Sequence, residues 1–186
     1  MNILVTGAGG QLGQELQEAV LTRSSQHTYH FADRASLDLT DASALEAYLE
    51  AHAIQLIINA AAYTAVDRAE DEPEMADLVN HQAVATLAHL AKRRDAFLLH
   101  VSTDYVFSGD AHTPYTEEAP TAPLGVYGRS KCLGEEAILA SGVRHLILRT
   151  SWLYSAYGAN FVKTMCRLQS ERQGLRVVFD QVGSPT

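Results

Sequence analysis

Residues 3–16 read ILVTGAGGQLGQEL and decide the fold. The first three are apolar, which is typical of a buried strand, and the pattern from Gln11 onward is that of an amphipathic helix. Between them, Gly7, Gly10 and Gly13 follow a Gly-x-x-Gly-x-x-Gly spacing rather than the commoner Gly-x-Gly-x-x-Gly. Such a turn lets a pyrophosphate approach free amides at a helix N-terminus. The stretch predicts the first unit of a dinucleotide-binding sheet.

The rest of the chain repeats this alternation of short apolar runs and helical patterns. Alternating strands and helices indicate βαβ units with right-handed crossovers and a parallel sheet covered on both faces. We therefore expect a doubly wound, Rossmann-like α/β fold. The further strands are expected at 28–32, 56–59, 96–101, 144–149 and 175–179, and the helices at 11–21, 42–51 (capped by Asp41), 73–94, 126–139 and 161–172.

Composition argues against several classes of protein. The 186 residues carry a formal net charge of −8, whereas a duplex nucleic-acid binder shows a basic surface. No run reaches the ~18 apolar residues of a membrane span, and no signal peptide is visible at the N-terminus. Cys132 and Cys166 are too few for a disulfide framework, and the eight histidines lack zinc-site spacing. We expect a cytoplasmic protein without nucleic-acid or membrane partners.

Residues after the second predicted strand bear on the choice of cofactor. Asp33 lies twenty positions after Gly13, where a carboxylate accepts from the adenosine ribose hydroxyls of NAD. Arg34 instead suits the 2′-phosphate of NADP. These two neighbours favour opposite cofactors, so NADH and NADPH both stay open. Asp38 and Leu39 come next and are expected to flank the adenine.

The segment Tyr127 to Lys131, YGRSK, is the sharpest local signal of chemistry. Residues four apart share a helix face, so the Lys131 ammonium is expected near the Tyr127 phenol. A tyrosine with a pKa of ~10 is a poor acid–base catalyst at neutral pH, and a neighbouring cation lowers that pKa. The pair alone is common on solvated helices. Here it accompanies a dinucleotide turn and the hydroxyl of Thr103.

Other candidate residues follow the ends of predicted strands. In a parallel sheet, carboxyl ends face the ligand crevice. We expect Thr103 to bind a substrate oxygen and Asp104 a substrate hydroxyl. Small residues from Asn59 to Ala62 allow close approach of a cofactor. Trp152, the only tryptophan, either stacks on a planar ring or packs in the core.

These segments resemble the extended short-chain dehydrogenase/reductase family, and they span nearly the whole chain. The two most specific are STDYVF and RTSWLY, which are similar to members that reduce dTDP-4-dehydrorhamnose. The full set comprises TGAGGQLGQEL (6–16), NAAAYTAVDRAE (59–70), STDYVF (102–107), YGRSK (127–131), RTSWLY (149–154) and DQVGSPT (180–186).

The resemblance implies hydride transfer from NADPH or NADH to the 4-keto group of dTDP-4-dehydro-β-L-rhamnose. Tyr127 would donate the proton, Lys131 would hold the nicotinamide ribose, and Thr103 would position the phenol. Some members also dimerise around Mg²⁺ through a glutamate that matches Glu15, and the other ligands would lie beyond residue 186. The remaining implied contacts are Gly10, Gln11, Leu12, Asp38, Leu39, Ala62, Tyr63 and Thr64 to the cofactor, and Thr103, Asp104 and Trp152 to the sugar.

The resemblance also sets expectations for domains and leaves alternatives. Residues 1–150 would form the NAD(P)-binding domain with the catalytic residues. Residues 151–186 would begin a smaller substrate-binding region, incomplete here because the family continues past this length. Another nucleotide-sugar epimerase or dehydratase, which recycles a tightly bound cofactor, stays open. So does a non-catalytic relative of the regulatory subunit of methionine adenosyltransferase, although the intact Tyr127–Lys131 pair counts against it.

Overall fold

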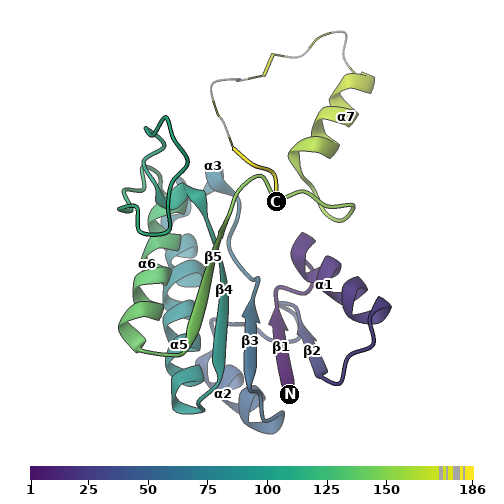
Figure 1. Cartoon of the computed structure of the whole chain (residues 1–186), viewed down its shortest axis with the longest axis vertical. Helices are drawn as coiled ribbons and strands as arrows, with labels where there is room; N and C mark the ends of the chain where they lie inside the picture. The colour runs from purple at the N-terminus through teal and green to yellow at the C-terminus, as the bar shows by residue number, and fades with distance from the viewer. Residues whose placement is uncertain (172–173, 175, 178–180, 182) are drawn as a thin grey trace.

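The structure, a computed structural model, describes every residue except 172, 173, 175, 178–180 and 182. Five parallel strands form one sheet in the order β2-β1-β3-β4-β5 (Figure 1), which confirms the predicted doubly wound fold. The strands are β1 (Asn2–Thr6), β2 (Thr28–Ala32), β3 (Leu56–Asn59), β4 (Phe97–Thr103) and β5 (His145–Thr150). Of the predicted strand 175–179, residues 176 and 177 are described and belong to no strand, and the others lie outside the described residues.

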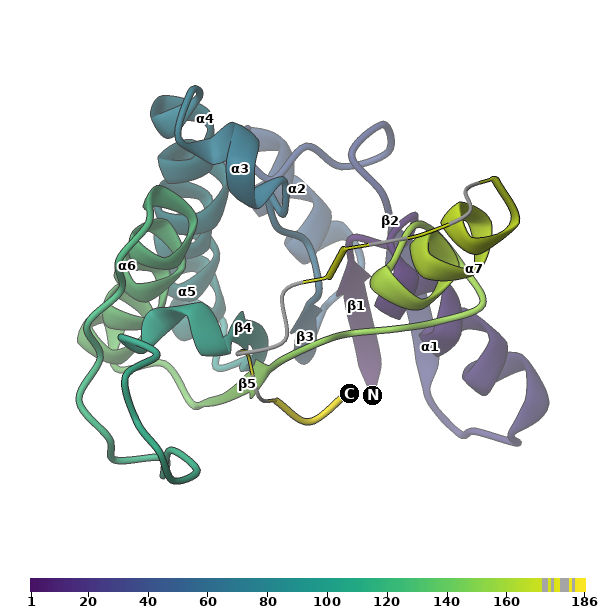
Figure 2. The same ribbon diagram turned by 90° about the horizontal axis from the view of Figure 1, so that it is seen from above.

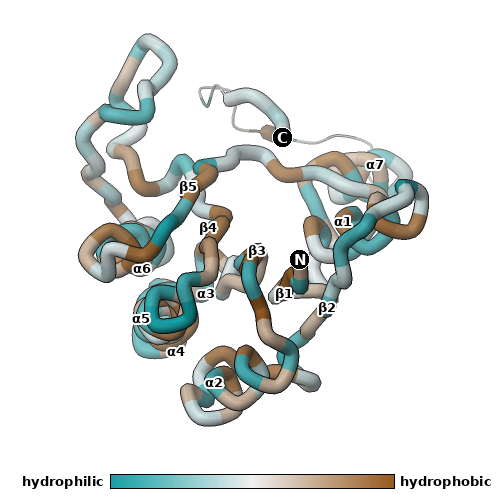
Figure 3. The backbone as a smooth tube through the Cα atoms, turned by 60° about the horizontal axis from the view of Figure 1, so that its bottom comes forward, coloured by the Kyte–Doolittle hydropathy of each residue, from teal (hydrophilic) through white to brown (hydrophobic). Residues whose placement is uncertain are grey.

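Helices lie on both faces of the sheet (Figure 3). From β1 the chain moves to one side to form β2, then returns past β1 to form β3. Right-handed crossovers therefore place α1 on one face and α2, α5 and α6 on the other. The helices are α1 (Gln11–Thr22), α2 (Ala42–Ala51), α3 (Val66–Ala69), α4 (Pro73–Asp77), α5 (Ala83–Arg93), α6 (Val126–Ser141) and α7 (Phe161–Glu171).

The main core lies between the sheet and the layer of α2, α5 and α6. Leu4, Ile57 and Leu98 stand at paired positions on β1, β3 and β4, and all three are fully buried. Leu45 of α2 and Leu87 of α5 close over them and are equally buried. This packing fixes the strands so that all their carboxyl ends reach one edge, which faces upward in Figure 1.

The predicted single helix over residues 73–94 is wrong in one respect. Pro73 occupies the first turn as expected, but a five-residue π-helical turn, η1 (Leu78–Gln82), separates α4 from α5. The turn presents buried Asn80 to Tyr63 and Ser130, which come from distant parts of the chain. Hydrophobic periodicity does not reveal such a turn, because contacts from elsewhere in the fold stabilise it.

Asp41 caps α2 as the sequence predicts, and this gives a test of the helix boundary. Its Oδ1 accepts hydrogen bonds from the amides of Ser43 and Ala44, each at 3.0 Å. Asp41→Ala should lower the free energy of unfolding by about 1 kcal/mol, measured by urea denaturation. Asp41→Asn keeps a capping oxygen and should retain most of the stability. An equal loss in both variants would contradict the capping role.

Candidate active site

The glycine turn joins β1 to α1 under tight steric limits. Gly7 has a φ of +71°, and a Cβ there would lie 2.7 Å from the backbone of Ala60. A Cβ on Gly13 would collide with the carbonyl oxygen of Gly7. Gly10 is the N-cap of α1, with no side-chain cap and no acidic residue in the first turn. The free amides and the positive end of the helix dipole therefore suit an anionic group.

The predicted adenosine contacts lie at the end of β2. The Asp33 carboxylate accepts from the amide and hydroxyl of Ser36 at 2.9 and 2.8 Å, and these hydrogen bonds lower its pKa. Arg34 forms an exposed ion pair with Asp38 at 3.7 Å. Both Asp33 and Arg34 stay at the surface, so the geometry suits either cofactor. Leu39 is partly buried against the main core.

The loop after β3 is held by Asn80, a residue that sequence reasoning missed. Asn80 accepts from the Tyr63 amide at 2.8 Å and donates to the Tyr63 carbonyl at 3.0 Å. It also donates to the Ser130 hydroxyl of α6 at 3.0 Å. The Tyr63 hydroxyl itself donates to Glu72 at 2.9 Å. Asn80 thus ties Tyr63 of the predicted cofactor segment 62–64 to the helix that carries Tyr127.

Tyr127 lies buried in the first turn of α6, close to the residues that end β4. Its ring meets that of Tyr105 edge-on, with centroids 5.6 Å apart. Burial raises the pKa of the Tyr127 phenol, a hydrogen bond with Thr103 lowers it in part, and Asp104 raises it further. The Thr103 hydroxyl donates to Asp104 at 3.1 Å, and burial raises the pKa of that carboxyl.

Lys131, one turn further along α6, is almost fully buried. Its Nζ donates to the Val101 carbonyl at 2.8 Å and lies 3.2 Å from Nε2 of His100. Burial lowers the Lys131 pKa to about 8, against an opposing effect of Glu135. Within the described residues no hydrogen bond joins Lys131 to Tyr127. The predicted lowering of the Tyr127 pKa by Lys131 stays a prediction.

Several residues outside the predicted set hold α6 in place. Glu70 accepts from the Val126 amide at 2.7 Å and so caps the helix. A Cβ on Gly128 would collide with the carbonyl oxygen of Tyr105, so the glycine lets α6 closely approach the short 3-10 helix η2 (Asp104–Val106), which follows β4. Buried Glu135 pairs with Arg149 of β5 at 2.6 Å. No local sequence pattern reveals these contacts, because each joins two distant segments.

Two further predicted residues contact α7 or the segment that leads to it. Trp152 has a φ of +50°, is exposed, and meets Phe161 edge-on with centroids 5.3 Å apart. Glu15 accepts from the Ser155 hydroxyl at 2.6 Å. Over the described part of the chain, no group of three metal-ligating side chains is found. The predicted role of Glu15 at a Mg²⁺ ion stays a prediction.

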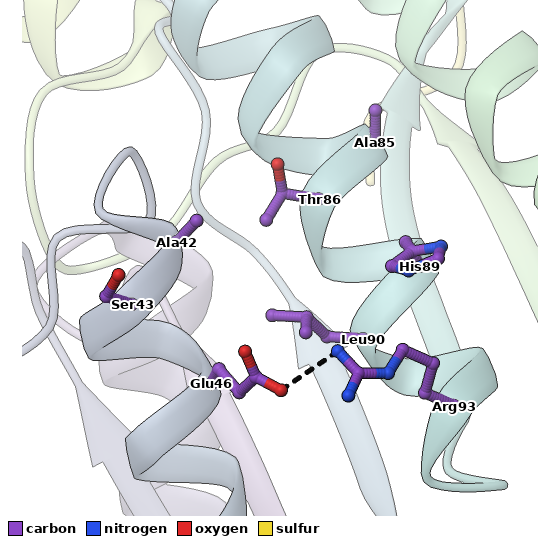
Figure 4. Close-up of a pocket in the computed structure, with 8 residues that line it drawn as sticks. All are labelled: Ala42, Ser43, Glu46, Ala85, Thr86, His89, Leu90 and Arg93. Carbon is purple, nitrogen blue, oxygen red and sulfur yellow. Dashed lines mark hydrogen bonds and ion pairs between the residues drawn. The ribbon is translucent and has the colours of Figure 1, made fainter.

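Because the strands are parallel, the structure brings the predicted residues to one edge of the sheet. Seen from that edge, α3 and α6 lie on one side and α1 and α7 on the other (Figure 2). A groove of about 440 Å³ lies elsewhere, between α2 and α5 (Figure 4), and none of the predicted residues lines it.

Among the described residues, every helix is too short or too polar to span a membrane.

The profile of the family described as "RmlD substrate binding domain" matches residues 1–186. The chain belongs to this family. An RmlD-family relative from Escherichia coli, "dTDP-4-dehydrorhamnose reductase", is 44% identical over 188 residues, covering 100% of this chain and 62% of that protein. A Streptomyces antibioticus relative, "Probable dTDP-4,6-dihydroxy-2-methyloxan-3-one 4-ketoreductase", is also 44% identical, covering 100% of this chain and 63% of that protein.

Solved structures agree with this RmlD-family assignment. The crystal structure of dTDP-4-dehydrorhamnose reductase from Bacillus anthracis, in complex with NADP, has a TM-score of 0.95 and 41% identity to this chain. The match covers 100% of this chain and 65% of that one. The chain thus spans under two thirds of the length of these relatives.

The glycine turn of this RmlD-family chain gives a matched pair of substitutions. Gly13→Ala should destabilise the protein by about 1–3 kcal/mol, because its Cβ meets backbone atoms that cannot give way. Gly9→Ala should cost far less, because its Cβ lies 4.0 Å from the nearest atom, in Asp33. Thermal unfolding measures both. Equal losses would contradict the steric account.

The buried amine gives a pH test. Between pH 8 and about 10.4, where a free lysine titrates, the unfolded chain binds more protons at Lys131 than the folded protein does. Stability should therefore rise with pH across this window. In Lys131→Met that contribution should vanish, so the free energy of unfolding of the unmodified protein should rise relative to that of the variant above pH 8. Parallel curves would mean that the Lys131 pKa is not lowered.

Proposed function

We propose that this chain carries the cofactor and catalytic part of an NAD(P)H-dependent reductase, which converts dTDP-4-dehydro-β-L-rhamnose to dTDP-L-rhamnose. The observation that carries the proposal is the buried Tyr127 beside Thr103 and Asp104, at the same sheet edge as the glycine turn. The names of the Escherichia coli and Bacillus anthracis relatives support this substrate.

The described residues fit a nicotinamide dinucleotide. Gly7 and Gly13 leave no room for a side chain at the turn, and α1 begins with uncapped amides. The amides of Gly10, Gln11 and Leu12 would hold the pyrophosphate. Asp33 or Arg34, with Asp38 and Leu39, would meet the adenosine end, and residues 62–64 the other half. When bound, the reduced nicotinamide supplies the hydride.

Tyr127 would act as the acid. Burial keeps its phenol protonated at neutral pH, so a proton is available for the oxygen that forms at the former keto carbon. Thr103 would orient that phenol. Lys131, with a pKa of about 8, is mostly charged at pH 7 and would favour the phenolate once the proton has left. It would also hold the nicotinamide ribose, while Asp104 and Trp152 would face the sugar.

The proposal extends to the division of the chain and to the range of sugars. Residues 1–150 would bind the cofactor and perform the chemistry, and residues 151–186 would begin the sugar-nucleotide pocket. The Streptomyces antibioticus relative is named for another dTDP-linked ketosugar at the same identity. A dTDP-4-ketosugar of different substitution is therefore the second candidate substrate. Glu15 would contribute one ligand to a Mg²⁺ ion around which two copies of the protein dimerise.

The test uses the complete gene product that contains these 186 residues. NADPH and NADH absorbance at 340 nm is followed after addition of dTDP-4-dehydrorhamnose. Tyr127→Phe should lower kcat about 10²–10⁴-fold, because general acid catalysis is lost. Its Kd for the preferred cofactor should stay near that of the unmodified protein, because the phenyl ring keeps the packing.

Other results would overturn the proposal. Sugar conversion without net cofactor oxidation would indicate an epimerase or dehydratase. Cofactor binding without any turnover, together with stable binding to methionine adenosyltransferase, would indicate a regulatory subunit. Oxidation that persists in Tyr127→Phe would remove this tyrosine from its role.

A further inference from the structure

A chain of buried polar side chains runs across one face of the sheet and ends at Lys131. Thr6 of β1, Asn59 of β3, His100 of β4 and Lys131 of α6 are each at most 1% exposed. Consecutive members lie 2.7, 3.0 and 3.2 Å apart, from Thr6 Oγ1 to Asn59 Oδ1, Asn59 Nδ2 to His100 Nδ1, and His100 Nε2 to Lys131 Nζ. No solvent reaches these groups, so they must satisfy one another.

The direction of the hydrogen bonds follows from Asn59. Its oxygen accepts from the Thr6 hydroxyl and, at 3.3 Å, from the backbone N–H of Ala61, which is only a donor. The NH₂ group of Asn59 therefore faces His100 and donates to Nδ1. A neutral imidazole carries one N–H. His100 must then carry its proton on Nε2, the nitrogen that faces Lys131.

An N–H of His100 aimed at Lys131 requires a lone pair on Nζ. A neutral amine has a lone pair, whereas an ammonium has none. The observed arrangement thus fits the neutral amine, which still donates to Val101. With a charged Lys131, the ring proton would have to move to Nδ1 and the Asn59 amide would have to turn over. In the reversed orientation, Asn59 Oδ1 no longer accepts the hydrogen bond from the backbone N–H of Ala61.

We propose that His100 is a positioning residue for Lys131, and that the tautomer of its ring is coupled to the charge on the lysine. The neutral amine goes with the Nε2–H tautomer, and the ammonium goes with the Nδ1–H tautomer and a reversed Asn59. The catalytic meaning of this coupling rests on the proposed function, because it sets the charge beside Tyr127. The coupling itself is a property of this chain.

The charged surroundings support the coupling. Burial lowers the Lys131 pKa to about 8, and burial together with Lys131 holds the His100 pKa well below its usual range. His100 therefore stays neutral while Lys131 titrates. The titratable group that also acts on Lys131 is Glu135 on α6. On the neighbouring strands, Asn59 and Ile147 stand at the positions paired with His100, and neither carries a charge.

The first experiment needs no substitution. In protein labelled with ¹³Cε lysine and ¹⁵N histidine, NMR follows Lys131 and His100 from pH 6 to 10. The chain has only three lysines, and Lys92 and Lys163 serve as references because they contact other groups. We expect the His100 tautomer to change with the same midpoint as Lys131. A single tautomer throughout the Lys131 titration would overturn the proposal.

The second experiment changes the partner. In His100→Gln, a carbonyl oxygen accepts from the ammonium with no tautomer to reverse, so the Lys131 midpoint should rise by about one pH unit. His145→Gln on β5 is the matched control, since His145 bonds to Val143 instead, and it should leave the midpoint in place. An unchanged midpoint in His100→Gln would contradict the coupling.

A kinetic arm separates this inference from the proposed function. In the complete gene product, the pH profile of kcat should shift in His100→Gln by the same amount and direction as the NMR midpoint. If the unmodified protein oxidises no cofactor, the proposed function fails while the NMR result still decides the coupling. An active enzyme whose pH profile does not move with residue 100 would overturn the catalytic meaning of His100.

Discussion

The burial of one amine constrains much of this site. Lys131 sits between α6 and the carboxyl end of β4, where water cannot solvate its charge. A buried lysine costs stability unless neighbouring groups accept its hydrogen bonds or it loses its proton. The Val101 carbonyl accepts from Nζ at 2.8 Å, and the His100 ring lies 3.2 Å from the same atom. Both come from β4, so the position of the amine depends on the depth at which α6 packs against that strand.

Small residues and a partly buried ion pair set that depth. Gly128 and Gly134 let α6 touch the backbone of Tyr105 and Asn80, positions where a Cβ would collide. The ion pair between Glu135 of α6 and Arg149 of β5 holds the same helix against that strand. Tyr127 and Lys131 are thus held by contacts on both sides of α6.

Local patterns account for most of the fold but for less of the site. The five described strands, the cap at Asp41 and the glycine turn follow from apolar runs and turn chemistry within a few residues. The spacing from Tyr127 to Lys131 places both on one helix for the same reason. Local patterns do not predict the roles of Asn80, His100 and Glu135. Each of these side chains contacts a partner more than thirteen residues away in the sequence, as Glu135 contacts Arg149.

The π-helical turn η1 has a consequence for how α4 and α5 are used. One residue corresponds to about 100° of rotation around a helix axis. A turn with a wider repeat therefore shifts the phase of α5 relative to α4. This lets α4 present Ala76 to a small cluster that it forms with Ala69 and Tyr127, while α5 presents Leu87 to the main core. Deleting one residue from 78–82 would restore a continuous α-helix. Either Ala76 or Leu87 would then be turned away from the cluster that it packs against.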